Sequence, residues 1–377
     1  MRFSLNKKDI IEIIQHLIGV IPAKSSMLTL SNFKIEVEKE ATEITITASD
    51  LNITTIVKIP KAEDTTIEAG SILIHAKKFT EIISALPDKQ INFSLRDDYL
   101  TIECGDSSFE INYSDTELFP EICNLDTQVE YRFNAGSFKK LISNTAFCTS
   151  SDSAYNTLTG VNFNFQGNLL TMAASDTKRI AEAKLVTDYT NVPQYEIILP
   201  LRALSFIEKN IKSETDEVII KYDEHRISFY LKGGIQLISN KYSGKFPNYT
   251  LPFQKIPESS LVINRNIFRD AVKRVSLLSE DDDNCVVLFL NNKEIKIESS
   301  SSEKGNAKEI IKYFEYDGPE TFYSLNSRLL ISIINIIETT DVVLKFSSTE
   351  EPIWLLNKED IEPVEIRFLM MSLRNRR

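Results

Sequence analysis

The sequence predicts an α+β protein made of three copies of one domain, each with two helices packed on antiparallel sheets. The first observation is an internal repeat. Three helix-like segments, LIHAKKFTEIISALP, ILPLRALSFIEKNIK and YSLNSRLLISIINII, align with Phe79, Leu204 and Leu329 in register, 125 residues apart each time. The second is the alternation of apolar and polar residues at 44–46 and 295–297, which is typical of half-buried strands. A period this long is far beyond that of a solenoid and indicates triplicated domains.

Shorter features follow the same period. TASD at 47–50 matches AASD at 173–176, and the Phe-Pro pair at 119–120 recurs at 246–247. A short apolar strand follows the second helix of every copy, at 91–95, 218–222 and 342–346. We therefore expect three copies of one domain at 1–125, 126–252 and 253–377.

Each expected helix has an apolar stripe along one face. In 6–17 the residues Ile10, Ile13, Ile14 and Leu17 follow the i, i+3, i+4, i+7 spacing, with Asn6 as a plausible N-cap. A proline directly after the second helix of the first copy is a stop signal. The six expected helices are 6–17, 76–86, 136–148, 201–212, 265–278 and 326–337.

Composition excludes several classes of protein. With 377 residues, 42% of them apolar, the chain can bury a large core. No run approaches the roughly 18 apolar residues of a membrane helix, and the start, MRFSLNKKD, does not resemble a signal peptide. The three histidines lie on separate segments, so we expect no metal and no cofactor. The cysteines are far apart and are expected to be reduced thiols of a cytoplasmic protein: Cys104, Cys123, Cys148 and Cys285.

The formal net charge is −11, which at first argues against DNA as a partner, because DNA affinity depends on phosphate charge. The charge is unevenly distributed, however. The six expected helices together carry +9, which leaves −20 on the remainder. If these helices share one side of a continuous sheet, they form one basic surface suited to phosphate contact without base reading. For any single helix, a solvated charged face is the simpler interpretation.

Five segments in order carry a resemblance to a known family: MRFSLNKKDIIEIIQHLIGVIPAKSSMLTLSNFKIE, AKKFTEIISALP, TMAASDTKRIAEAKL, SGKFPNYTLP and FLMMSLR. In these segments and in its three-copy layout the chain resembles the bacterial sliding clamp, the beta subunit of DNA polymerase III. The resemblance implies a ring closed by a head-to-tail homodimer, with six DNA-clamp domains, helices lining the hole and sheets outside.

The resemblance also implies a function. Duplex DNA would pass through the hole without being read, and the ring would act as a DNA replication processivity factor by tethering the polymerase. Implied partners are duplex DNA, a second copy of the chain, the DNA polymerase III catalytic subunit, the clamp loader and other clamp-binding replication and repair proteins. No membrane partner and no catalytic residue are implied.

Two alternatives belong to other classes. An enzyme would need a site, and Asp50 and Asp176 recur at one repeat position, but a role in a strand-end turn is the favoured interpretation. A protein-interaction scaffold of triplicated domains that does not encircle DNA would keep the repeats, yet it would not need every helix to avoid net negative charge.

Matching positions in the family assign three sets of residues. The partner-peptide cleft comprises Leu158, Ser175, Thr177, Lys178, Arg179, Ile180, Pro247, Pro252, Pro352, Leu369 and Met371. The DNA-facing residues are Lys24, Lys78, Arg202, Lys209 and Arg274. The dimer interface comprises Lys78, Ile82, Leu86 and Phe109 on one side and Arg274, Leu277 and Leu278 on the other.

The chain departs from the family pattern at three places. Thr177-Lys178 replaces a common Gly-His, and Ser372 replaces a Pro. The acidic run at 280–283 lacks the Gly and the terminal Glu of a calcium loop, so we interpret it as a solvated turn.

Overall fold

The computed structural model describes residues 1–22, 27–40, 42–62, 67–96, 98–122, 125, 127, 129–242 and 244–373. The chain divides into two compact units. The first comprises Met1–Lys139 and Arg202–Tyr242, and the second comprises Lys140–Leu201 and Ser243–Arg377. Neither unit coincides with one predicted repeat, because sheets run from one copy into the next. The boundaries at 125 and 252 therefore stay a prediction.

The order of elements repeats three times: strand, helix, four strands, helix, three strands, with one extra short strand in the third copy. The first copy contains β1 (Arg2–Asn6), α1 (Lys7–Leu17), β2 (Asn32–Val37), β3 (Glu43–Ser49), β4 (Ile53–Pro60), β5 (Gly70–His75), α2 (Ala76–Ala85), β6 (Gln90–Leu95), β7 (Tyr99–Cys104) and β8 (Ser107–Ser114).

The second copy contains β9 (Tyr131–Asn134), α3 (Ala135–Ser143), β10 (Gly160–Gly167), β11 (Leu169–Ser175), β12 (Arg179–Val186), β13 (Val192–Pro200), α4 (Leu201–Asn210), β14 (Glu217–Tyr222), β15 (Arg226–Leu231) and β16 (Ile235–Asn240). The third contains β17 (Ser259–Asn264), α5 (Arg265–Val275), β18 (Cys285–Leu290), β19 (Ile295–Ser301), β20 (Gly305–Ile311), β21 (Glu315–Asp317), β22 (Thr321–Asn326), α6 (Ser327–Ile336), β23 (Asp341–Phe346), β24 (Ile353–Asn357) and β25 (Val364–Met370).

Successive copies are joined edge to edge by one recurring strand pair. The fourth strand of one copy pairs antiparallel with the last strand of the next, as β4 with β16 in the first unit and β12 with β25 in the second. The strands form three sheets. Their strand orders are β1-β6-β7-β8-β5-β2-β3-β4-β16-β15-β14-β9, β13-β10-β11-β12-β25-β24-β23-β17-β21 and β20-β19-β18-β22. The fourth strand of the third copy, β20, is consequently an edge strand of its sheet.

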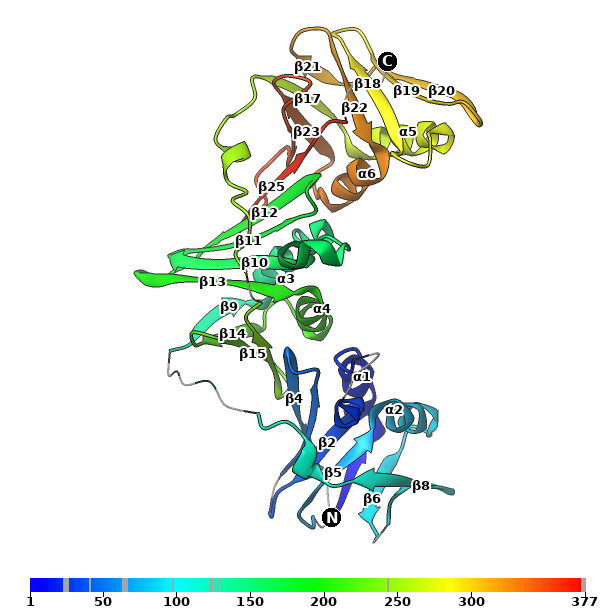
Figure 1. Ribbon diagram of the computed structural model, residues 1–377, viewed down its shortest axis with the longest axis vertical. Coiled ribbons are helices and arrows are strands. Elements are labelled where there is room, and N and C mark those ends of the chain that lie inside the picture. Colours follow the sequence, from blue (N-terminus) through cyan, green and yellow to red (C-terminus); the bar gives the residue numbers. More distant parts are fainter. Residues whose placement is uncertain are drawn as a thin grey trace. The chain divides into compact units, whose positions relative to one another are not determined.

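Helices pack next to one another within each unit (Figure 1). In the first unit α1 contacts α2, and His16 Nδ1 lies 2.9 Å from Asn210 Oδ1, at the end of α4. In the second unit α5 contacts α6, and α5 also contacts β17, β19 and β20. The apolar stripe predicted for α1 is inside, with Ile10, Ile14 and Leu17 buried.

Two helices are shorter than predicted, because 3-10 turns replace the last part of each. The helix expected over 136–148 ends at Ser143 and is followed by η3 (Ala146–Cys148), and that over 265–278 ends at Val275 and is followed by η6 (Ser276–Leu278). Tightened final turns of this kind are common at helix ends. Asn6 is the N-cap residue of α1, as predicted, but its side chain makes no capping hydrogen bond; its amide donates to Asp9 Oδ2 at 3.0 Å instead.

None of the helices in the described ranges is long and apolar enough to cross a membrane.

Candidate functional site

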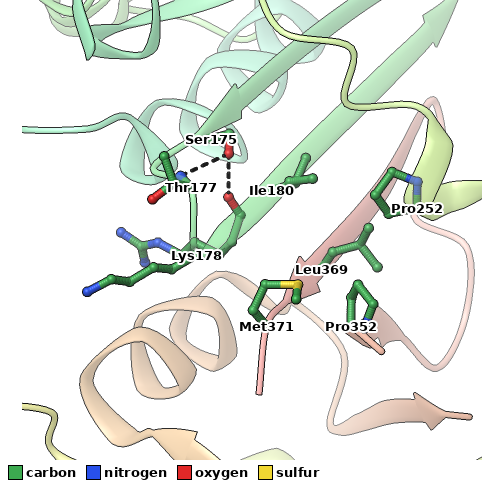
Figure 2. A pocket seen from close by; sticks show the side chains of 9 residues that line it. Ser175, Thr177, Lys178, Ile180, Pro252, Pro352, Leu369 and Met371 are labelled. Carbon is green, nitrogen blue, oxygen red and sulfur yellow. Dashed lines mark hydrogen bonds between the residues drawn. The ribbon is translucent and has the colours of Figure 1, made fainter. Parts of the chain in front are cut away.

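A cleft in the second unit brings together most of the residues predicted for partner binding (Figure 2). It has a volume of about 220 Å³ and lies where β12 and β25 meet η5 (Leu251–Phe253) and the start of β24. Its nine lining residues are Ser175, Thr177, Lys178, Arg179, Ile180, Pro252, Pro352, Leu369 and Met371. Two predicted members are not among them: Leu158 is buried, and Pro247 is an exposed residue outside the lining. That the cleft binds a peptide stays a prediction.

The floor of the cleft is apolar because the paired strands β12 and β25 each place a large apolar side chain at the same register position. Ile180 of β12 is the register partner of Leu369 of β25. Leu369 belongs to a buried cluster with Phe253 and Trp354, whose rings meet edge to face with centroids 5.6 Å apart. Met371, by contrast, is 43% exposed. The floor is therefore rigidly packed, whereas Met371 is free to adapt to an occupant.

The turn between β11 and β12 forms one end of the cleft, and Asp176 shapes it. Asp176 Oδ1 accepts hydrogen bonds from the backbone N–H groups of Lys178 at 3.0 Å and Arg179 at 2.9 Å. Ser175 Oγ donates to the Arg179 carbonyl at 2.9 Å. Thr177 adopts a φ of +74°, which is unfavourable for a β-branched residue. The predicted turn role of this aspartate, rather than a catalytic one, matches these contacts.

Arg179 acts as an internal support of the cleft. Its side chain is only 10% exposed and forms an ion pair with Asp176, Nε to Oδ2, at 2.8 Å. The guanidinium also donates to the Phe147 carbonyl at 2.8 Å, lies over the Phe147 ring and donates to Ser332 Oγ. Because these groups satisfy both the charge and the donors of Arg179, the cleft receives little of its positive charge.

A second ion pair supports the opposite wall, and sequence reasoning missed it. Arg367 of β25 stands opposite Glu182 of β12 in the strand register, and its Nε donates to Glu182 Oε1 at 3.0 Å. The Glu182 side chain is only 4% exposed. The Arg367 guanidinium also lies over the Phe253 ring, 4.7 Å from its centroid. Since Phe253 adjoins Pro252 in η5, the ion pair holds the segment that forms this wall.

Comparisons with known proteins agree with the three-copy layout. Three models that describe the N-terminal, central and C-terminal domains of the DNA polymerase III beta subunit match residues 1–124, 132–248 and 251–371. This chain belongs to the bacterial sliding clamp family. It is 27% identical to a beta sliding clamp of Staphylococcus epidermidis, over 96% of each chain, and 25% identical to that of Bacillus subtilis, over 97% of this chain and 98% of the relative.

Solved structures share the fold of this clamp over the whole chain. The sliding clamp of Bacillus subtilis superposes with a TM-score of 0.92 at 24% identity, and covers 100% of both chains. The DNA polymerase III subunit beta of Pseudomonas aeruginosa, solved with bound griselimycin, gives the same TM-score at 22% identity and the same coverage. The prediction of three clamp domains of helices on antiparallel sheets is thereby confirmed.

The residues predicted to face DNA differ in exposure and in whether their charge is already paired within the chain. Lys209 of α4 and Lys78 of α2 are exposed, and Lys78 is paired with Glu81 at 3.1 Å. Arg274 of α5 makes a two-pronged contact with Glu309 of β20, at 2.6 and 3.0 Å. Lys24 lies outside the described residues. A direct role for any of these in DNA binding stays a prediction.

The guanidinium of Arg202, also predicted to face DNA, makes several contacts within the clamp itself. It pairs with Asp50 Oδ2 at 2.8 Å and donates to the carbonyls of Gly19 at 2.8 Å and Val20 at 2.6 Å. These acceptors lie in the segment that follows α1. Arg202 therefore joins α4 to the end of α1 and to the turn after β3, while its side chain stays 47% exposed.

The residues predicted for the dimer interface divide by exposure. Leu277 is 72% exposed and Phe109 is 37% exposed, while Leu278 and Ile82 are half-buried. Leu86 was assigned wrongly: at 3% exposure its side chain is already buried within its own chain and offers no apolar surface to a second copy.

The acidic run at 280–283 forms a turn tied to its neighbours. Lys304 Nζ pairs with Asp281 at 2.7 Å, and Asn284 Nδ2 donates to the Asp281 carbonyl at 3.0 Å. Across the described part of the chain, no cluster of three or more His, Cys, Asp or Glu residues is arranged to hold a metal ion.

Proposed function

We propose that this clamp is a processivity factor of DNA replication: two copies close head to tail around duplex DNA, slide along it without reading sequence, and tether the replicative polymerase. Tethering makes each rebinding of the polymerase effectively intramolecular, which raises the local concentration without any new contact with DNA. No bond is made or broken in this activity, so the protein is proposed to be non-catalytic, and to work in the cytoplasm.

One observation carries the proposal of ring closure. The fourth strand of copy one pairs with the last strand of copy two, and the fourth strand of copy two pairs with the last strand of copy three. By the same rule, β20 of copy three needs the last strand of a first copy, which is β8. In its own sheet β8 lies between β7 and β5, but it pairs with β5 only at Tyr113 and Ser114, so residues 107–112 are paired on one side only in the described structure. Since β8 belongs to the other end of the chain, a second molecule supplies it, and two such junctions close a ring of six domains.

Side chains near these two edges support the same junction. Leu277, exposed in η6, lies next to β20, with which η6 is in contact, and Phe109 is exposed on β8. A partner strand that added to β20 or to residues 107–112 of β8 would cover these apolar side chains. Arg274, although paired with Glu309 of β20, lies in the same region.

Sedimentation velocity at micromolar concentration tests closure, and retention on DNA tests encirclement. A dimer that, after loading, stays longer on circular than on linearised plasmid is expected. A monomer, or equal retention on the two DNA forms, would contradict the closed ring and favour the alternative of a scaffold that does not encircle DNA.

We propose further that the cleft binds short peptides of the DNA polymerase III catalytic subunit, the clamp loader and other clamp-binding replication and repair proteins. An apolar floor with one adaptable methionine suits the apolar anchors of a linear peptide. Met371→Ala is expected to weaken peptide binding while unfolding temperature and dimerisation stay unchanged. Leu369→Ala is a poorer probe, because deleting this buried side chain destabilises the protein by about 2–5 kcal/mol.

A further inference from the structure

The two junctions between copies within the chain use the same strand positions. Val57 of β4 stands opposite Ile235 of β16. Ala183 of β12, 126 residues after Val57, stands opposite Ile366 of β25. Backbone register alone therefore allows copy one to pair with the last strand of copy three and to skip copy two. Wrong pairing of this kind is a typical failure of repeat proteins, so side chains must specify which copies adjoin.

An ion pair crosses each junction at the same place in the repeat. In the first unit, Glu12 of α1 pairs with Lys212, two residues beyond the end of α4. In the second unit, Lys140 of α3 pairs with Glu338, two residues beyond the end of α6, at 3.4 Å between Nζ and Oε2. Glu12 and Lys140 are each the sixth residue of their helix. The two ion pairs occupy equivalent positions, but their charges are exchanged.

Copy two supplies the cation at both of its junctions, and an arginine accompanies the lysine on each side. Toward copy one, Arg202 pairs with Asp50 at 2.8 Å. Toward copy three, Arg179 donates to Ser332 Oγ of α6. Copy two is thus basic on both sides, and each neighbour presents an acidic side chain to it.

The same charges disfavour the two wrong pairings. Copy one placed on copy three would bring Glu12 next to Glu338, and copy two placed on copy two of another chain would bring Lys140 next to Lys212. Like charges at such positions repel by about as much as opposite charges attract. Since all four side chains are a third or more exposed, each pair favours the right neighbour by about two- to fivefold.

We infer that these two ion pairs specify the order in which the copies join. Their exchanged charges make copy two the copy that fits between the other two, and they make copies one and three repel each other. The inference concerns the assembly of the chain and depends neither on DNA nor on an occupant of the cleft. It predicts that exchanging the charges at one junction harms assembly, whereas exchanging them at both junctions does not.

Charge exchange in the full-length chain provides the test. The first exchange combines Glu12→Lys with Lys212→Glu, the second combines Lys140→Glu with Glu338→Lys, and the combined exchange carries all four substitutions. Correct neighbours keep opposite charges in all three variants. In the first and in the second exchange, however, copies one and three also attract each other. In the combined exchange they again repel.

Refolding measures the outcome. Each protein is unfolded in urea, diluted to micromolar concentration and separated by size-exclusion chromatography with light scattering, which distinguishes the native species from larger, misassembled ones. Urea unfolding of the native species gives its stability. The control exchanges the charges of Lys255 and Glu351, an exposed pair 2.7 Å apart in the second unit, because neither residue belongs to a helix at a junction.

We expect the first and second exchanges each to give about two- to fivefold more misassembled protein than the unaltered chain, with a native species of similar stability. The combined exchange and the control should refold as the unaltered chain does. Equal refolding of all variants overturns the inference and leaves the ion pairs a local role. Refolding of the combined exchange that is no better than that of either single exchange overturns it as well, because the loss would then not depend on which copies match.

Discussion

Asp50 and Asp176 hold the same turn in successive copies of the repeat, 126 residues apart. Each uses Oδ1 to accept hydrogen bonds from the backbone N–H groups two and three residues further on, at 2.7–3.0 Å. The residue after each aspartate has a positive φ, +75° at Leu51 and +74° at Thr177. The third copy differs: Ser301, the last residue of β19, accepts from the backbone N–H groups of Glu303 and Lys304 at 3.4 Å, and the positive φ is at Gly305. The aspartate turn is therefore a structural feature of the first two copies, which accounts for the recurrence of the aspartate by its role in the turn.

The second oxygen of each aspartate binds an arginine, but the two arginines come from different elements. Asp50 pairs with Arg202 of α4, in the next copy, and Asp176 pairs with Arg179, in its own hairpin. Both guanidinium groups also donate to carbonyls in the segment that follows the first helix of a copy, at Gly19 and at Phe147. Each unit thus places one arginine between a turn and a helix end.

The first prediction distinguishes a structural role of Arg202 from contact with DNA. Arg202→Ala should lower the free energy of unfolding by about 1–2 kcal/mol, because several charge-assisted hydrogen bonds are lost. Lys209→Ala should leave stability nearly unchanged and reduce the salt dependence of DNA binding, as expected for a lysine that contacts phosphate. Urea unfolding and DNA-binding titrations at several salt concentrations measure the two effects. Equal loss of stability in both variants would contradict the assignment.

The second prediction concerns strain at the cleft. Thr177→Gly should raise the free energy of unfolding by about 1 kcal/mol, because glycine adopts a φ of +74° without steric cost. The matched control is Lys178→Gly in the same turn, where φ is not positive and the more flexible unfolded chain should lower stability by a similar amount. Thermal unfolding of both variants gives the comparison, and a fall in stability for Thr177→Gly would show that its side chain compensates for the strain.

The sequence predicts those features that depend on local spacing, and it misses those that depend on pairing across the sheet. The helical stripes and the 125-residue register place all six helices, since both are periodic in the chain. The segments around Ser175 and Leu369 supply seven of the nine lining residues of the cleft, because each is a short motif. The ion pair of Glu182 with Arg367 joins residues 185 apart, and no spacing rule reveals such a pair. The buried state of Leu86 likewise depends on packing.

The third prediction concerns that ion pair. Arg367→Ala should weaken peptide binding by more than the loss of folded protein accounts for. The reason is that Phe253 and the adjoining Pro252 lose the guanidinium that covers them. It also leaves the Glu182 carboxylate buried with only Lys184 as partner, at 2.9 Å, so a destabilisation of about 3 kcal/mol is expected.

A double substitution distinguishes positioning from stability in this case. Glu182→Gln combined with Arg367→Met should recover much of the stability, because no unpaired charge remains buried. If Arg367 positions the wall through Phe253, peptide affinity should stay reduced in this recovered variant. Full return of affinity together with stability would show that the ion pair acts only on folding. Isothermal titration with a cleft-binding peptide and urea unfolding measure both quantities.

The fourth prediction concerns pH. Asp223, in the turn between β14 and β15, is partly buried, which raises the pKa of its carboxyl. Hydrogen bonds from the backbone N–H groups of His225 and Arg226 and from the Arg226 side chain outweigh this effect and lower the pKa below its ordinary value. A carboxyl with a lowered pKa in the folded state stabilises the protein above the pKa of the unfolded state, about 3.9, and loses that contribution as pH falls through the folded pKa.

Asp223→Asn should therefore be less stable than the unaltered protein by about 1 kcal/mol at pH 7, and the difference should shrink as pH falls below about 4 and through the lowered pKa of the folded state. Asparagine retains an oxygen for the two backbone N–H groups, which are 2.9 and 2.8 Å from Oδ1, so the substitution removes mainly the charge. Glu224→Gln, an exposed acid in the same turn, should show no such dependence. Urea unfolding between pH 2 and pH 8 measures it. A difference that stays constant with pH would mean that the turn depends on the shape of residue 223 and not on its charge.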